Sequence, residues 1–350
     1  MKISIGTNIK EGPWGGGNLF AKNLKNFLIK SGHDVYDNLS ENDLDIILIT
    51  EPRKTSESSA FTHVDVKKYL DYVNDNAIVV HRINECDERK NTNYVNKYII
   101  EANKIADQTV FVSEWLKNIY TNQGINEKNN DVILAGSNSD VFNRDNFIPW
   151  TTDKKLRIVT HHWGANWNKG FEAYDKLDKL IGSSEWKNVI EFTYIGNLPK
   201  KYKFENAYHI EPLSGEELAN EIKKSHLYIT GSINEPSGNH HIEAAQCGLP
   251  ILYINSGGVK EYCKGYGLEY SVSNLEETLS IFMKDHTFYY ENMKDYPFSS
   301  EKMCKDFENL FFNLLDKKEQ IYNTRFFEKN KNFLGKVFYF LIKNLKNYLR

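Results

Sequence analysis

Residues 235–261 read EPSGNHHIEAAQCGLPILYINSGGVKE and carry the clearest structural signal in the chain. A turn over 236–239 precedes a segment of helical character at 239–247, and a Gly-Leu-Pro sequence ends that segment before an apolar strand at 251–254. Gly238 has no side chain that would cover the first turn of the expected helix. The first N–H groups of such a helix lack partners, so its N-terminus favours an anion such as phosphate.

Two carboxylates frame this expected helix. Glu235 precedes it, and Glu243 follows eight positions later within it. Eight residues make just over two helical turns, so the two carboxylates can lie on the same side. The arrangement suits a ligand with a diphosphate and hydroxyl-bearing sugars, because N–H groups bind the first and carboxylates bind the second. An ordinary capped helix with a solvated acidic face is the alternative interpretation.

Composition limits the classes of protein to consider. The chain has 350 residues, 40% of them hydrophobic, which exceeds the usual size of a single core and predicts two domains. A net charge of −3 gives no indication of a nucleic-acid partner. The four cysteines include no C-x-x-C pair, which argues against a zinc site or disulfide framework and fits a reducing compartment. The chain starts directly with a strand and has no apolar run of ~18 residues, so we expect a cytoplasmic protein without signal peptide or membrane span.

Short apolar strands alternate with longer amphipathic helices along most of the sequence. Strands are expected near 2–5, 45–49, 77–80, 108–112, 131–134, 156–160, 190–195, 226–229 and 250–254. Helices are expected near 18–31, 64–74, 92–106, 113–123, 169–181, 214–224, 239–247 and 274–285. This alternation predicts an α/β protein with two doubly wound parallel-sheet domains that face each other across a cleft, joined by a linker near 143–155. Ligands of such sheets bind at the carboxyl ends of the strands.

A glycine-rich loop follows the first expected strand and precedes a helix. Gly15, Gly16 and Gly17 let the backbone approach a ligand closely and turn its N–H groups toward an anion. The loop matches neither the G-x-G-x-x-G dinucleotide pattern nor a P-loop, so a flexible connection is the alternative interpretation.

A polar cluster follows the expected strand at 77–80. There His81 can hydrogen-bond a sugar hydroxyl and Arg82 can pair with an anion, unless the segment is simply a solvated loop.

Lys169 follows the strand at 156–160 and starts an expected helix. Its ammonium group would lie beside the N–H groups of that helix, where a phosphate can bind. The adjacent histidine pairs at 161–162 and 240–241 lack further ligands at metal spacing, so no metal site is expected.

Five sequence elements occur in an order and spacing that resemble a known family. They are Gly15-Gly16 with Ser31-Gly32-His33-Asp34-Val35, Ala106-Asp107 through Ser113, Gly136-Ser137-Asn138 with Phe142, the E-x7-E element from Glu235 to Glu243, and Ser256-Gly257-Gly258 with Glu261. Together they are similar to the retaining glycosyltransferases of the GT-B fold, glycosyltransferase family 4 in particular, over roughly residues 1–285. Asn138 stands where that family has an acid.

The resemblance implies roles for individual residues around a nucleotide-sugar donor, UDP- or GDP-linked, with no further cofactor. The donor-binding residues implied are Gly15, Gly16, Gly17, Gly238, Asn239 and Glu243, the last holding the ribose hydroxyls. The catalytic residues implied are Glu235 at the transferred sugar, Lys169 at the leaving diphosphate and His81 near the sugar. The family commonly has an arginine where this chain has Gly164, and His161, His162 and Arg82 are candidates for the missing charge.

Domain boundaries follow from the same reading. We expect an acceptor-side domain at 1–148, a nucleotide-sugar domain at 149–298, a helix at 299–320 that returns toward the first domain, and a basic amphipathic tail at 321–350. The tail contains seven basic residues and one acid, with apolar residues at helical spacing opposite the lysines. Such a helix can lie on an anionic membrane surface or pack on the protein body, and we weigh these alternatives equally.

The predicted activity is transfer of a hexose from the donor to a hydroxyl acceptor, a glycan, glycolipid or polysaccharide precursor, with retention at the anomeric carbon. A lipid-linked acceptor would fit a protein that is cytoplasmic and peripheral on the inner membrane face. Two alternatives remain: a nucleotide-sugar epimerase or phosphorylase on the same scaffold, and a non-catalytic nucleotide-sugar or carbohydrate-binding protein.

Overall fold

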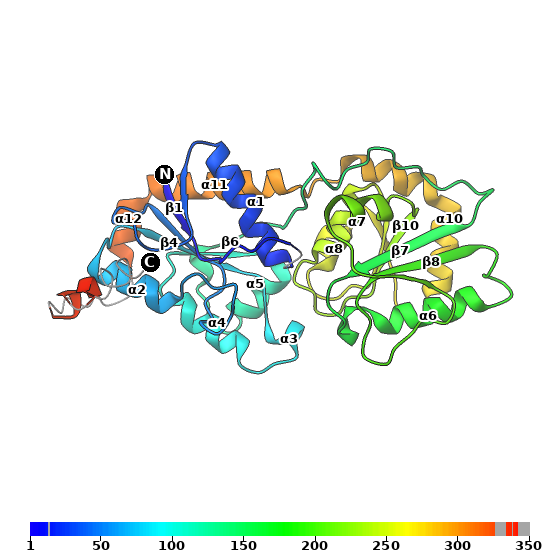
Figure 1. Ribbon diagram of the computed structural model, residues 1–350, viewed down its shortest axis with the longest axis horizontal. Coiled ribbons are helices and arrows are strands. Elements are labelled where there is room, and N and C mark those ends of the chain that lie inside the picture. Colours follow the sequence, from blue (N-terminus) through cyan, green and yellow to red (C-terminus); the bar gives the residue numbers. More distant parts are fainter. Residues whose placement is uncertain (13–14, 326–333, 338, 342–350) are drawn as a thin grey trace.

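The computed structural model describes residues 1–12, 15–325, 334–337 and 339–341. Figure 1 shows two α/β domains side by side along the long axis of the molecule, the first in blue to cyan and the second in green to yellow. The expected fold class, two facing doubly wound parallel-sheet domains, is confirmed.

Within the described residues, the first domain contains a six-stranded parallel sheet in the order β2-β1-β3-β4-β5-β6. Its strands are β1 (Lys2–Ile5), β2 (Asp34–Tyr36), β3 (Ile46–Ile49), β4 (Ile78–Ile83), β5 (Gln108–Phe111) and β6 (Asn130–Val132). Its helices are α1 (Gly16–Lys30), α2 (His63–Tyr72), α3 (Asp87–Lys90), α4 (Val95–Asn103), α5 (Glu114–Thr121) and the short 3₁₀ helix η1 (Glu127–Asn129).

The second domain has, over the part of the chain that the structure describes, a six-stranded parallel sheet in the order β12-β11-β10-β7-β8-β9. Its strands are β7 (Leu156–His162), β8 (Ile190–Gly196), β9 (Tyr208–Ile210), β10 (Leu227–Thr230), β11 (Ile251–Tyr253) and β12 (Gly267–Glu269). Its helices are η2 (Trp167–Lys169), α6 (Phe171–Gly182), α7 (Gly215–Ile222), α8 (Asn239–Gln246), α9 (Val259–Cys263), α10 (Leu275–Asn292) and η3 (Met293–Asp295).

Alternate residues of the strands face opposite sides of each sheet and form separate cores. In the first sheet, Ile46 and Leu48 pack toward α1, whereas Ile47 and Ile49 pack toward α2. The strands are apolar on both faces because helices cover both, which is the pattern expected of a parallel sheet.

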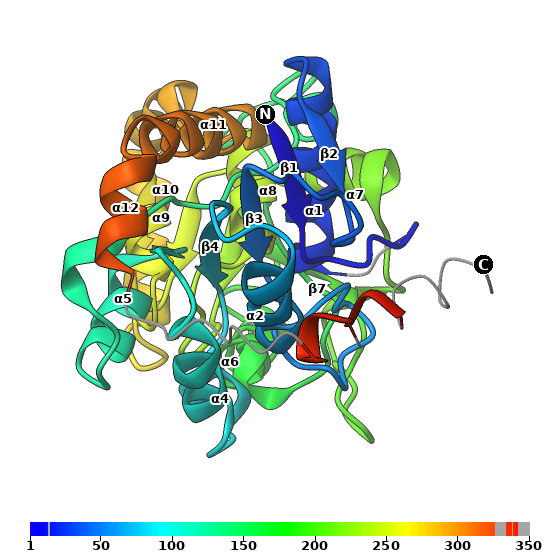
Figure 2. The ribbon, with the colours of Figure 1, turned by 90° about the vertical axis from the view of Figure 1, so that its left-hand side faces the viewer.

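The chain returns to the first domain after α10. Helix α11 (Ser300–Asp316) packs against α1, where the rings of Phe20 and Phe307 lie 5.2 Å apart, and α12 (Lys318–Thr324) follows it. Figure 2 shows α11 and α12 on the side of the first sheet opposite α2.

The two chain crossings between the domains are hydrogen-bonded to each other. Ser137 and Ser299 form a parallel bridge, and the Ser300 N–H donates to the Ser137 carbonyl at 2.7 Å. A Cβ at Gly136 would lie 2.1 Å from the Ser299 carbonyl oxygen, so only glycine permits this approach. Ala135 and Phe142 already pack in a core of the second domain. The segment 143–155, expected as the linker, follows this crossing.

The described part of the tail has two different environments. Arg325 is buried and forms a two-point ion pair with Asp107, with N···O distances of 2.8 and 2.7 Å. Leu334, Val337 and Leu341 are exposed. The remaining tail residues, 326–333, 338 and 342–350, lie outside the described residues. No helix among the described residues is both long enough and apolar enough to cross a bilayer.

Candidate functional site

The site lies at the carboxyl ends of β7 and β10, where the strand order of the second sheet reverses. Strands β8 and β9 follow β7 on one side, and β10, β11 and β12 follow on the other. In sheets of this kind the crossover connections leave in opposite directions at such a point, which is where their ligands bind. The loop after β7 carries Lys169, and the loop after β10 carries Glu235 and the start of α8.

The N-terminus of α8 provides the backbone donors expected from the sequence. Gly238 precedes the helix with φ of 84°, and no described side chain caps it. A Cβ on Gly238 would lie 2.5 Å from the His241 ring, so the turn requires glycine for both conformation and space. The first N–H groups of α8 therefore remain available to an anion.

The glycine-rich loop of the first domain meets this helix end. Helix α1 begins at Gly16 after Gly15, whose φ is 81°. A Cβ at Gly16 would lie 3.1 Å from the Asn239 side chain, and one at Gly17 would lie 3.9 Å from Asn84. The N-termini of α1 and α8 thus face each other across the domain boundary, and both carry positive dipole ends. The structure brings Gly16 of the first domain close to Asn239 of the second, two residues that the sequence analysis assigned to one ligand.

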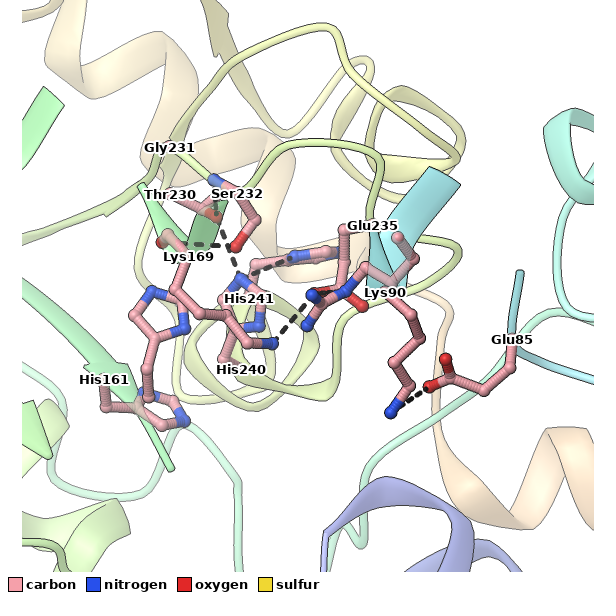
Figure 3. Close-up of polar contacts among 12 residues, drawn as sticks. Glu85, Lys90, His161, Lys169, Thr230, Gly231, Ser232, Glu235, His240 and His241 are labelled. Carbon is pink, nitrogen blue, oxygen red and sulfur yellow. Dashed lines mark hydrogen bonds and ion pairs between the residues drawn. The ribbon is translucent and has the colours of Figure 1, made fainter. Parts of the chain in front are cut away.

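Lys169 and Glu235 form an ion pair at the centre of the site. The Lys169 Nζ lies 3.0 Å from Glu235 Oε2, and the Arg89 Nε lies 3.1 Å from the same oxygen. Burial alone would raise the pKa of Glu235, but the charges of Lys169 and Arg89 together lower it to about 2. Glu235 is therefore ionised at any physiological pH. Figure 3 shows Lys169 directed at Glu235, while Lys90 and Glu85 pair on the opposite side.

Lys169 occupies a 3₁₀ turn rather than the first turn of a helix. The sequence predicted a helix from 169, but α6 begins at Phe171, after Gly170 in a left-handed conformation with φ of 110°. A Cβ on Gly170 would lie 2.7 Å from Gly231, so the turn packs directly on the loop after β10. This close approach holds Lys169 against the loop that leads to Glu235.

Glu243 lies on the buried face of α8 and is bonded to a histidine. The His161 Nε2 is 2.9 Å from Glu243 Oε2, and the His161 backbone N–H donates to the Tyr228 hydroxyl at 3.0 Å. Because both His161 and Glu243 are largely buried, the pair holds this carboxylate in a defined orientation at the base of the site.

The candidates from the polar cluster after 77–80 lie elsewhere. Strand β4 extends to Ile83, so His81 and Arg82 are inside a buried strand and not in a loop. His81 is bonded to Asn103 at 3.1 Å, and burial lowers its pKa to about 3. The Arg82 guanidinium lies 3.8 Å from the Phe20 ring centre. Both side chains make these contacts within the first domain, and neither is joined to Glu235 or Lys169.

Four histidines, His161, His162, His240 and His241, gather beneath the site, and Figure 3 labels three of them. The rings of His162 and His240 lie 4.5 Å apart, and His162 is 2.6 Å from the Tyr174 hydroxyl. Burial lowers the pKa of His162 and His240 well below the usual value, and lowers that of His241 to about 3. In the part of the chain that the structure describes, no group of three or more potential ligands could hold a metal ion.

These neutral histidines should make the protein sensitive to acid. Below a pH of about 6.5 the histidines of the unfolded chain bind protons, whereas the buried rings of the folded chain stay neutral. The free energy of unfolding therefore falls by about 1.4 kcal/mol for each histidine per unit decrease in pH. We expect a melting temperature clearly lower at pH 5 than at pH 7, measured by calorimetry. The His240→Gln variant should show a shallower dependence, and equal melting temperatures at both pH values would contradict this account.

Two of the contacts between the domains that the sequence did not predict bear on the site. One is the contact of Arg89 with Glu235, for which the sequence analysis named no candidate. Glu261 accepts hydrogen bonds from the backbone N–H groups of Glu114 and Trp115, at 2.8 and 2.9 Å, and so caps α5 of the other domain. The only sequence signal for the α5 contact was the Ser-Gly-Gly-x-x-Glu spacing at 256–261.

Comparisons with known proteins agree with this fold. Residues 181–294 match the family model described as glycosyl transferases group 1. The fold is similar to sucrose-phosphate synthase from Thermosynechococcus elongatus (TM-score 0.61, 12% identity, 90% of this chain and 99% of that chain). It is also similar to Anabaena HepE in complex with UDP and glucose (TM-score 0.64, 11% identity, 89% and 99%). A third match is a glycosyltransferase from Rickettsia africae (TM-score 0.57, 16% identity, 88% and 84%). No curated protein sequence matches the chain at a significant level.

Proposed function

We propose that this chain is a retaining hexosyltransferase, which the match of residues 181–294 to the glycosyl transferases group 1 model and the GT-B-like fold support. It moves a hexose from a nucleotide-diphosphate sugar to a hydroxyl acceptor. The observation that carries the proposal is the placement of Lys169 and Glu235 beside the uncapped N-terminus of α8, opposite the glycine loop of the other domain.

The site residues act on both groups that the breaking bond joins, the leaving diphosphate and the transferred sugar. Negative charge grows on the leaving diphosphate, and Lys169 and the N–H groups of α8 stabilise it. Glu235 contacts the transferred sugar as it becomes oxocarbenium-like, and Glu243 binds the ribose hydroxyls from the base of the site. Because Lys169 and the helix end supply positive charge, we propose that the reaction is metal-independent. His81 is buried in β4 and bonded to Asn103, so it has no role at the transferred sugar in this proposal.

We propose a UDP-linked hexose as the donor, with a GDP-linked hexose as the alternative. The similar Anabaena HepE has been solved with UDP-glucose, and a similar E. coli structure is bound with UDP-2-fluoro glucose. The fold likeness supports a uridine nucleotide without identifying the sugar.

Product analysis tests the proposed function. The protein is incubated with a panel of UDP- and GDP-sugars and hydroxyl acceptors, nucleotide release is followed, and the product is examined by mass spectrometry and by NMR of its anomeric carbon. We expect nucleotide release that depends on the acceptor and a product with the anomeric configuration of the donor. A non-catalytic binding protein would show a donor-dependent thermal shift with no release for any acceptor, and an epimerase would change the sugar without an acceptor.

The exposed apolar residues of the tail support a peripheral position at an anionic membrane, with a lipid-linked acceptor. Arg325 is part of the folded body, so the tail is best removed after it. We expect a chain ending at Arg325 to keep its melting temperature but to lose sedimentation with liposomes that contain anionic lipid. Equal sedimentation of the full and shortened chains would reject the membrane contact, and a tail packed on the body would instead lower the melting temperature when removed.

A further inference from the structure

We propose that Arg89 of the first domain is a phosphate-binding residue that completes the diphosphate site of the second domain. This inference rests on the proposed function and deepens it. Arg89 contacts the same carboxylate oxygen as Lys169, at 3.1 Å against 3.0 Å. Whatever anion enters between Glu235 and the start of α8 therefore meets both cations.

The position of Arg89 is set by the fold of the first domain. Helix α3 is held by Asp87, whose carboxylate accepts hydrogen bonds from the backbone N–H groups of Val95 and Asn96, at 2.9 and 3.1 Å, and from Thr92. Burial alone would raise the pKa of Asp87, but these hydrogen bonds lower it. The Glu88 carbonyl, next in the chain, accepts a hydrogen bond from Asn234 of the second domain at 3.2 Å. Arg89 is thus presented to the site by an anchored helix.

The local charge favours an anionic ligand. Lys169 and Arg89 share Glu235, and the side chains of all three are 11–16% exposed. The neighbouring Lys90 forms an ion pair with Glu85 at 3.5 Å, so it adds no net charge to the site. The remaining positive charge, together with the positive end of α8, suits a diphosphate that carries more than one negative charge.

The guanidinium still has donors to offer. Among the described residues, Arg89 contacts Glu235 through Nε, and neither terminal nitrogen has a hydrogen-bond partner. Two parallel N–H groups match two phosphate oxygens in a bidentate arrangement, which a lysine cannot provide. Gly164 carries no side chain and therefore supplies no cation, whereas Arg89 of the other domain does.

Because Arg89 comes from the first domain, binding of the diphosphate is coupled to closure of the two domains. Lys169, Glu235 and α8 belong to the second domain, and Arg89 reaches them only when the domains meet as they do here. A separated pair of domains would offer the diphosphate Lys169 and the helix end alone. Diphosphate binding therefore stabilises the closed arrangement that excludes water.

Titration calorimetry of the full chain with UDP, GDP, uridine and guanosine tests the inference. We expect Arg89→Gln to weaken binding of the nucleoside diphosphate by about ten- to a hundredfold, the effect typical of a charged hydrogen bond, and to leave nucleoside binding unchanged. Arg89→Lys should lose less. Lys90→Gln, which changes the next cation of the same helix, should bind as the wild type does.

The outcomes separate the possible failures. UDP lacks the sugar that Glu235 contacts, so an Arg89 that only positions Glu235 would leave UDP and GDP affinity unchanged in Arg89→Gln, which would overturn the inference. Equal weakening by Lys90→Gln would also overturn it, because the effect would then reflect net charge. If the wild type binds neither UDP nor GDP, the proposed function itself fails. Unchanged nucleoside affinity shows that the variants are folded.

Discussion

Replacement of Lys169 by alanine should lower kcat by about 10²- to 10³-fold, or about 2.7–4 kcal/mol of barrier, the cost typical of removing one donor from a site of developing negative charge. The ammonium group lies 3.0 Å from Glu235 beside the uncapped end of α8, where the leaving diphosphate is proposed to bind. The loss should appear mainly in turnover, because Lys169 acts on charge that is largest in the transition state.

The measurement is steady-state release of nucleotide with a saturating donor. Lys176 provides a matched control on the following helix, since its ammonium group is exposed and, among the described residues, bonds only to the Ser273 carbonyl at 3.3 Å. Lys176→Ala should therefore turn over as the wild type does. A Lys169→Ala variant with unchanged kcat would show that the diphosphate leaves from another place.

Arg325→Ala is expected to cost about 3–5 kcal/mol of unfolding free energy, because it leaves the buried Asp107 carboxylate without its cation. The two side chains are 5% and 3% exposed, and Arg325 also donates to the backbone carbonyls of Asp75 and Ala77. Asp107 in turn accepts from the Val79 N–H at 2.8 Å, so the pair joins the end of α12 to β4.

Denaturant unfolding measures this effect. Lys302→Ala is the control, since Lys302 forms an exposed ion pair with Asp306 on α11 and such pairs contribute about 1 kcal/mol or less. If both variants unfold at the same denaturant concentration as the wild type, the Arg325 contact contributes nothing to the stability of the domain.

The sequence predicted the central elements well because burial imposes a strong pattern on them. Every residue of β3 is apolar and buried, and all four residues of β10 and three of the four of β1 are buried. The strands β2, β9 and β12 were not predicted. Each has three residues at or near a sheet edge, and Tyr208 of β9 is 63% exposed, so no hydrophobic run marks them.

Site residues that depend on local sequence features could be predicted, whereas those that depend on the contact between the two domains could not. Gly238 and Glu243 were found because a helix start and a helical spacing are local features. Arg89 was not, because it contacts Glu235 across 146 positions, and no periodicity encodes the meeting of two domains. The sequence predicted a loop position for Arg82, which is wrong. The sequence alone does not distinguish an arginine that is buried against an aromatic ring from one that is solvated.

The bonded crossings at Ser137 and Ser299 limit how the halves of the molecule can move. Two backbone segments that are hydrogen-bonded side by side resist sliding past each other more than they resist a hinge rotation of the domains. We therefore expect relative motion of the domains to be mainly a rotation about these crossings, which returns the two domains to the same alignment. Little orientational freedom remains to be lost when the substrate is enclosed, which favours rapid and reproducible assembly of the reacting groups.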